Sequence, residues 1–126
     1  MKNPTGILDN LKYATLALAN RNQYSHAEPF PHIVLDNFLD EDLVKSLSKV
    51  FPEEGKGEGW VPCGKEETRK SYIQDESCMP LVMRLMFREF NSPKLVLFME
   101  ALTGIEGLIP DPYLIGGGAH LSRPGD

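Results

Sequence analysis

Several features that mark common functional classes are scarce or missing in this chain of 126 residues. Its two cysteines, Cys63 and Cys78, form neither a CxxC pair nor the dense disulfide framework of small secreted proteins. We therefore expect free thiols in a reducing compartment. No apolar run reaches the roughly 20 residues of a membrane span. Residues 1–6 lack the apolar core of a signal peptide. The sequence therefore predicts a cytoplasmic protein without membrane association.

The chain also lacks an excess of positive charge. Its formal net charge is −5, which gives no general attraction for nucleic acid or for an anionic membrane. We therefore expect no nucleic-acid partner. Hydrophobic residues make up 41% and charged residues 25% of the chain, as in an ordinary globular protein. The length suits one modest core, so we predict a single domain over residues 1–126.

Short catalytic and metal-binding motifs are missing as well. The histidines are His26, His32 and His120, and no HxH, HxD or HExxH pair occurs, although a metal site commonly takes two ligands from such a local motif. Assembly of a site from the three scattered histidines is the less favoured alternative. No GxSxG elbow is present, and Cys63 has no evident base. We predict no catalytic residue and no metal ligand in this chain.

Four segments have the apolar spacing or the capping residues of helices. A polar loop over residues 22–28 should follow the first. The fourth is apolar nearly all round, and we expect it to be buried. The expected helices, with the residues that mark them, are 6–20 (Ile7, Leu11, Ala14, Leu18), 40–51 (N-cap Asp40, stop at Pro52), 79–90 (Leu81, Val82, Leu85, Met86) and 92–103 (N-cap Ser92, then Pro93, stop at Gly104).

Extended segments lie between and after these helices. The run His32–Leu35 suits a buried strand, and Trp60-Val61 is expected to begin another. Between residues 65 and 70 a mixed charge run predicts solvated surface. Tyr113–Ile115 favours extended chain. Strand alternation over residues 119–122 places His120 and Ser122 on one face and Ala119 and Leu121 on the other.

Glycine and proline surround this last strand. Gly116–Gly118 would let another backbone or a ligand come close. They are not a P-loop, which needs a lysine followed by Ser or Thr at the start of a helix. Arg123–Asp126 has turn composition. We therefore expect the sequence to end inside a turn, where a hairpin partner would normally follow.

Three stretches together resemble a known family. They are Pro29–Leu39 with the capped helix and Phe51-Pro52 after it, Asn91–Ile105, and Leu108–His120 closing with Arg123–Asp126; the last is the most specific. The chain is similar here to the N-terminal part of the iron(II)- and 2-oxoglutarate-dependent oxygenase superfamily, in its prolyl-hydroxylase-like branch. The resemblance covers most of the chain after Glu28.

The resemblance implies an α+β fold, with N-terminal helices packed on the first strands of an incomplete double-stranded β-helix, or jelly roll. Residues 1–28 would be a helix and loop, and residues 29–126 the family-like region. Iron(II) and 2-oxoglutarate are implied for an intact family member. Its HxD motif, its distal histidine and the basic residue that binds 2-oxoglutarate would come after Asp126. No cofactor is therefore expected for this chain alone. His120 would line the co-substrate pocket, and a structural histidine held by hydrogen bonds is the alternative.

Two functional interpretations follow. In the first, the chain is a truncated dioxygenase-like protein that is inactive by itself. In the second, it is a non-catalytic interaction module. Its glycine-rich edge, Gly116–Ser122, would then pair with another chain in a homo-oligomer or by strand exchange.

Overall fold

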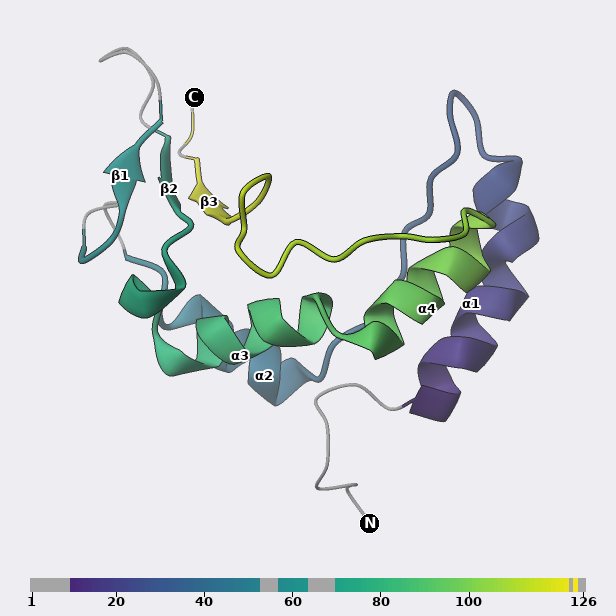
Figure 1. Ribbon diagram of the computed structural model, residues 1–126, viewed down its shortest axis with the longest axis horizontal. Coiled ribbons are helices and arrows are strands. Elements are labelled where there is room, and N and C mark those ends of the chain that lie inside the picture. The colour runs from purple at the N-terminus through teal and green to yellow at the C-terminus, as the bar shows by residue number, and fades with distance from the viewer. Residues whose placement is uncertain (1–9, 53–56, 64–69, 123, 125–126) are drawn as a thin grey trace. The chain divides into compact units, whose positions relative to one another are not determined.

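The computed structural model describes residues 10–52, 57–63, 70–122 and 124. Two compact units form, each from two separate stretches of sequence (Figure 1). The first unit contains the described residues up to Asp40 together with Met86–Pro110. The second contains Glu41–Leu85 together with the described residues from Asp111 onward. Helices and a small antiparallel sheet make up the chain, so the predicted α+β class is confirmed.

The first unit is built on two helices that pack side by side, α1 (Asn10–Ser25) and α4 (Pro93–Thr103) (Figure 1). Its buried core consists of Tyr13, Ala17, Phe98 and Leu102. Three aromatic rings meet there, because Phe38 lies 4.6 Å from the Tyr13 ring and 5.5 Å from the Phe98 ring, between centroids. Such pairs stabilise a core by about 0.5–1.5 kcal/mol each beyond the area that they bury.

The apolar stripe predicted for the first helix is wrong. Leu18 is 67% exposed and Ala14 is exposed, whereas Tyr13 and Ala17 are buried. Ile7 and the side chain of Leu11 lie outside the described residues. The buried face is marked by tyrosines as well as by aliphatic residues, and Tyr24 packs against the same core. Because Tyr24 is held there, the helix continues to Ser25 through residues predicted to be a loop.

The start and the end of α4 agree with the predicted caps. The Ser92 side chain accepts a hydrogen bond from Leu95 N, and Pro93 occupies the first turn. Gly104 ends the helix in the left-handed conformation, with φ 77°, which glycine adopts without a Cβ penalty. The expectation that the whole helix is buried is wrong, because Leu97 is 63% exposed. Only the face that carries Phe98 and Leu102 is buried.

The predicted strand at His32–Leu35 does not form. No strand is assigned there, and Val34 is 78% exposed. Ile33 and Leu35 are half-buried and pack against the core of the first unit. Alternate side chains are therefore anchored as in a strand, but no strand among the described residues pairs with this backbone.

The second unit contains a three-stranded antiparallel sheet in the order β1-β2-β3. The strands are β1 (Val61–Pro62), β2 (Ser71–Ile73) and β3 (Ala119–Leu121). In β2, Ser71 and Ile73 are buried. The sequence predicted β1 and β3 but not β2. Most of the mixed charge run, residues 65–69, lies outside the described residues, and Lys70 at its end is exposed.

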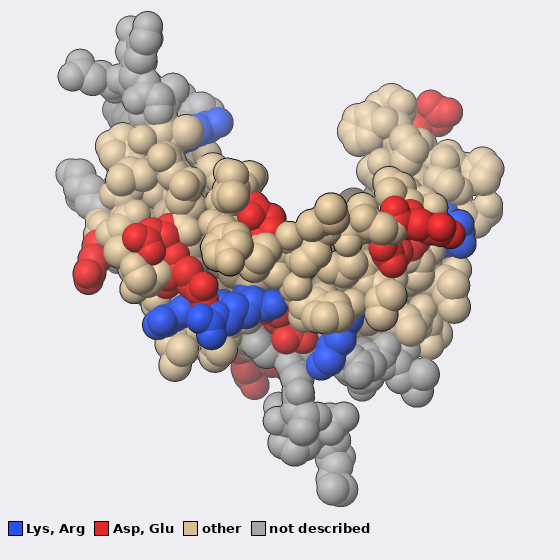
Figure 2. All heavy atoms as spheres, viewed as in Figure 1, with Lys and Arg blue, Asp and Glu red and all other residues tan. Residues whose placement is uncertain are grey.

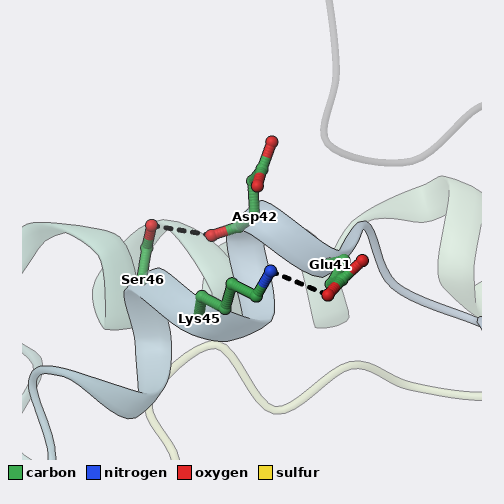
Figure 3. A network of polar contacts seen from close by, with 4 residues as sticks. All are labelled: Glu41, Asp42, Lys45 and Ser46. Carbon is green, nitrogen blue, oxygen red and sulfur yellow. Dashed lines mark hydrogen bonds and ion pairs between the residues drawn. The ribbon is translucent and has the colours of Figure 1, made fainter.

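Helices α2 (Glu41–Ser48) and α3 (Leu81–Phe90) also form, with the short 3-10 helix η1 (Glu76–Cys78) before α3. As predicted, acidic residues occupy the first turn of α2, where the helix dipole favours negative charge. Lys45 Nζ lies 2.7 Å from Glu41 Oε1, and Ser46 Oγ donates a hydrogen bond to the carbonyl of Asp42. Figure 3 shows both contacts. Both partners of the ion pair are exposed, so it stabilises the helix only weakly.

Charges of both signs are interspersed among uncharged residues on the face shown in Figure 2. Within the part of the chain that the structure describes, no helix is long and apolar enough to cross a membrane.

Candidate functional site

His120, the one residue predicted to line a co-substrate pocket, lies in the middle of β3. Its side chain is exposed, whereas Ala119 is buried and Leu121 is half-buried, so the predicted alternation of faces is confirmed. His120 lies opposite Tyr72 in the β2–β3 register. The two rings stack with centroids 5.9 Å apart and planes at 24°. The tyrosine therefore supports one face of the imidazole, and the role of His120 at a co-substrate stays a prediction.

Gly118 brings β3 close to β2. A Cβ built on Gly118 would lie 2.6 Å from the carbonyl oxygen of Ile73, closer than real Cβ atoms come to backbone. The sequence indicated that these glycines would let another backbone or a ligand come close, or let the strand bend, and at Gly118 another backbone does come close. Gly117 has no atom within 4 Å of such a Cβ. Only one of these two positions therefore requires glycine for reasons of space.

Asp111 organises the turn that leads into this strand. Its carboxylate accepts hydrogen bonds from Gly116 N at 2.8 Å and from Ile115 N at 3.0 Å. Its carbonyl accepts a third, from Leu114 N. The amide of Gly116, followed by that of Ile115, lowers the pKa of the Asp111 carboxyl below its ordinary value of 3.8. The charged form of Asp111 therefore holds the turn closed.

The extended chain predicted at Tyr113–Ile115 is wrong for this reason. Leu114 has φ 52° and is buried, while Tyr113 is 82% and Ile115 83% exposed. An aspartate that bonds to nearby backbone amides offers the chain an alternative to a strand. Sequence reasoning weighed the apolar residues and missed Asp111, although aspartate before proline is itself a signal for a turn.

The glycine-rich edge predicted at Gly116–Ser122 is only partly a strand. Residues 119–121 pair with β2, and the preceding glycines belong to the turn. The strand order places β3 at one edge of the sheet and β1, with Pro62, at the other. The outer side of β3 carries backbone groups that are not used by β2, and an edge of this kind can accept another strand.

The three histidines are divided between the two units. His26 and His32 are exposed residues of the first unit, and each has its Nδ1 within hydrogen-bond distance of a nearby carbonyl, of Asn22 and Phe30 respectively. His120 belongs to the second unit. Among residues 10–52, 57–63, 70–122 and 124, no three His, Cys, Asp or Glu side chains lie close enough together to hold a metal ion.

One histidine does precede a carboxylate by two positions, His26 before Glu28. It follows the last residue of α1 rather than a strand. The described residues therefore do not fit the two-histidine, one-carboxylate set that holds iron in oxygenases.

Comparison of the chain with protein families, with curated proteins and with solved structures found no match. The resemblance to the oxygenase superfamily therefore rests on the residues quoted above.

Proposed function

We propose that residues 29–126 form the N-terminal helices and the first strands of a prolyl-hydroxylase-like, iron(II)- and 2-oxoglutarate-dependent oxygenase, with a jelly-roll barrel. We further propose that the 126 residues by themselves are inactive. The observation that carries the proposal is the position of β3. It is an antiparallel edge strand that ends at Leu121, just before Arg123–Asp126. In the superfamily, a strand and turn of this kind lead into the HxD iron motif.

The other parts of the chain are consistent with this proposal. The helix capped by Ser92 and Gly104 lies where the resemblance expects the short helix before the barrel. The helix after Asp40 lies where it expects the helix that follows the opening segment. The opening segment itself, His32–Leu35, is not a strand here, so this part of the resemblance receives no support from the secondary structure.

The resemblance implies that bound iron and 2-oxoglutarate supply the oxidising power for hydroxylation of an unactivated C–H bond. No step of that reaction is assigned to the described residues, because they do not include a fitting set of iron ligands. In the proposed intact protein, β3 would carry His120 beside the co-substrate, with Tyr72 holding one face of the ring. The imidazole would then act by binding and orientation.

Reading the coding DNA beyond residue 126 tests this proposal. We expect the reading frame to continue through a His-x-Asp motif shortly after the turn at Arg123–Asp126. A frame that continues for the length of a barrel without that motif would contradict the oxygenase assignment. An in-frame stop codon at residue 127 would contradict it as well, and would favour the second candidate function.

The second candidate is a non-catalytic interaction module. Its supporting observation is the outer edge of β3, which β2 leaves unpaired, so another copy of the chain could add a strand there. Light scattering over a wide range of concentrations tests it. The module predicts a defined oligomer, whereas a monomer at every concentration would contradict the proposed homo-oligomer.

Proline variants locate the contact. Successive residues of a strand point their N–H groups to opposite sides. One of the two variants His120→Pro and Leu121→Pro therefore removes an N–H that points away from the sheet. The other removes an N–H that bonds to β2. The variant that loses the outward N–H should dissociate the oligomer and keep the far-UV circular dichroism of the parent chain.

A further inference from the structure

A cavity of about 510 Å³ lies within the second unit and is lined by residues other than those of β3. It lies among the C-terminal end of α2, the loop before β1, η1 and the start of α3. Small-molecule sites typically enclose about 300–1,000 Å³. The volume is therefore large enough for a ligand of several non-hydrogen atoms.

One buried nitrogen atom of a positively charged side chain in this cavity has no hydrogen-bond partner among the described residues. Arg84, on α3, lines the cavity, and its Nε atom is buried without a hydrogen-bond partner among the described residues. A buried donor left without an acceptor costs free energy that a bound acceptor would recover. The planar guanidinium matches a carboxylate, to which it can donate two parallel hydrogen bonds. Arg84 therefore indicates a carboxylate-bearing ligand.

The cavity also has an apolar wall, to which Trp60, Met79 and Leu81 contribute. The Trp60 ring lies against the Phe51 ring, with centroids 5.6 Å apart, which limits the orientations that the indole can take. Met79, 3% exposed, and Leu81 line the same cavity. A flat or cyclic hydrocarbon group is the kind of surface that such a wall accepts.

Two neighbouring features set the local charge. The cavity is bordered by Pro80 and Leu81, where α3 begins, so the positive end of the helix dipole adds to the charge of Arg84. Glu58 also lines the cavity, but its side chain is exposed, and water and salt therefore screen its repulsion of an anion. The positive charge of Arg84 and of the helix end, set against the screened charge of Glu58, favours a ligand with a single negative charge.

We propose that this cavity binds a small monocarboxylate with an apolar body, the carboxylate on Arg84 and the apolar body against Trp60. The site is separate from the oxygenase proposal, because it uses neither His120 nor the Gly116–Ser122 edge.

Trp60 is the one tryptophan of the chain, so its fluorescence reports on the cavity alone. The probe is cyclohexanecarboxylate, which does not absorb at the wavelengths used, and the control is cyclohexanecarboxamide, which has the same shape without the charge. We expect the carboxylate to produce a saturable change in Trp60 fluorescence. The carboxamide should bind about tenfold more weakly, since it lacks the charge-assisted hydrogen bonds.

Two arginine variants on the same helix make the matched comparison. Arg84→Gln should weaken binding of cyclohexanecarboxylate about tenfold. Arg88→Gln removes an exposed arginine of α3 that does not line the cavity, and it should leave the affinity unchanged. Equal affinity for the two probes, or equal affinity of the parent chain and the Arg84→Gln variant, would overturn the proposal.

A second measurement needs no variant. In a ¹H–¹⁵N spectrum of the unmodified chain, cyclohexanecarboxylate should shift the backbone amides of residues 57–60, 77–79 and 81–84, which line or border the cavity. Shifts confined to other residues would overturn the proposal even if Arg84→Gln did not fold. Neither the fluorescence sample nor the ¹H–¹⁵N sample contains iron or 2-oxoglutarate. The outcome of both measurements is therefore independent of the proposed oxygenase function.

Discussion

The rings of Tyr72 and His120 stack across the β2–β3 pair, with centroids 5.9 Å apart and planes at 24°. The two residues lie directly opposite in the register, far apart in the sequence. This contact joins β2, a strand that the sequence did not predict, to His120, the residue that the sequence analysis proposed for the co-substrate pocket.

The stacked pair should stabilise the sheet. We expect Tyr72→Ala and His120→Ala, made singly and together, to give a coupling free energy of about 0.2–1 kcal/mol, the range for cross-strand pairs. Urea unfolding of the four chains measures this coupling. Strictly additive effects would show that the two rings do not interact in solution.

Gly118 should not tolerate a larger residue, because an added Cβ would lie 2.6 Å from the carbonyl oxygen of Ile73. We expect Gly118→Ala to lower the free energy of unfolding by about 1–3 kcal/mol. Gly117→Ala is the matched control, since that position has open space around it. Equal effects of the two substitutions would contradict the close approach of β3 to β2.

The core of the first unit allows a similar comparison within one helix. Phe98 is 5% exposed, and its neighbour Leu97 is 63% exposed. Phe98→Ala should lower the free energy of unfolding by about 3–5 kcal/mol, and Leu97→Ala by less than about 0.5 kcal/mol. Thermal or urea unfolding checks both values. A Leu97→Ala effect as large as that of Phe98→Ala would mean that the other face of α4 is buried.

The turn held by Asp111 should make stability depend on pH. The pKa of this carboxyl is lowered by the amides of Gly116 and Ile115, so the folded chain releases its proton more readily than the unfolded chain does. The stability that Asp111 adds is therefore fully present above its ordinary, unfolded pKa of 3.8. It is lost as the pH falls through the lower folded pKa.

Asp111→Asn should be less stable at neutral pH and should lose less stability on acidification. The Asp36→Asn variant, which removes an exposed carboxylate outside the turn, is the control. Denaturant titrations between neutral pH and pH 3 make the comparison. Some acid dependence will persist in both variants, because Ser77 lowers the pKa of Asp75 in the same unit. If Asp111→Asn and the parent chain lost the same stability, Asp111 would not hold the turn.

Local signals predicted much of the fold. Ser92, Pro93 and Gly104 bounded α4 because caps act within a few residues of themselves. The acidic first turn of α2 was predicted for the same reason. The alternation around His120 was also correct, since it follows from strand geometry alone.

Other elements depend on partners that the sequence does not show. The three residues of β2 become a strand by pairing with β1 and β3, whereas no described strand pairs with the apolar run at His32–Leu35. Tyr113–Ile115 has strand-forming residues, but the Asp111 carboxylate accepts a hydrogen bond from Ile115 N and so holds this segment in a turn. The cavity at Arg84 brings together residues from several separate segments, so no local pattern could have predicted it.

The central proposal is that these residues form the beginning of an oxygenase and that its iron ligands follow Asp126. The most direct test measures succinate release from 2-oxoglutarate, with added iron(II), by two polypeptides. One is residues 1–126, and the other is the same chain extended through its downstream reading frame. We predict release by the extended chain and none by residues 1–126 above the protein-free control. Release by residues 1–126 alone, or by neither polypeptide when the extension carries the His-x-Asp motif, would contradict the account.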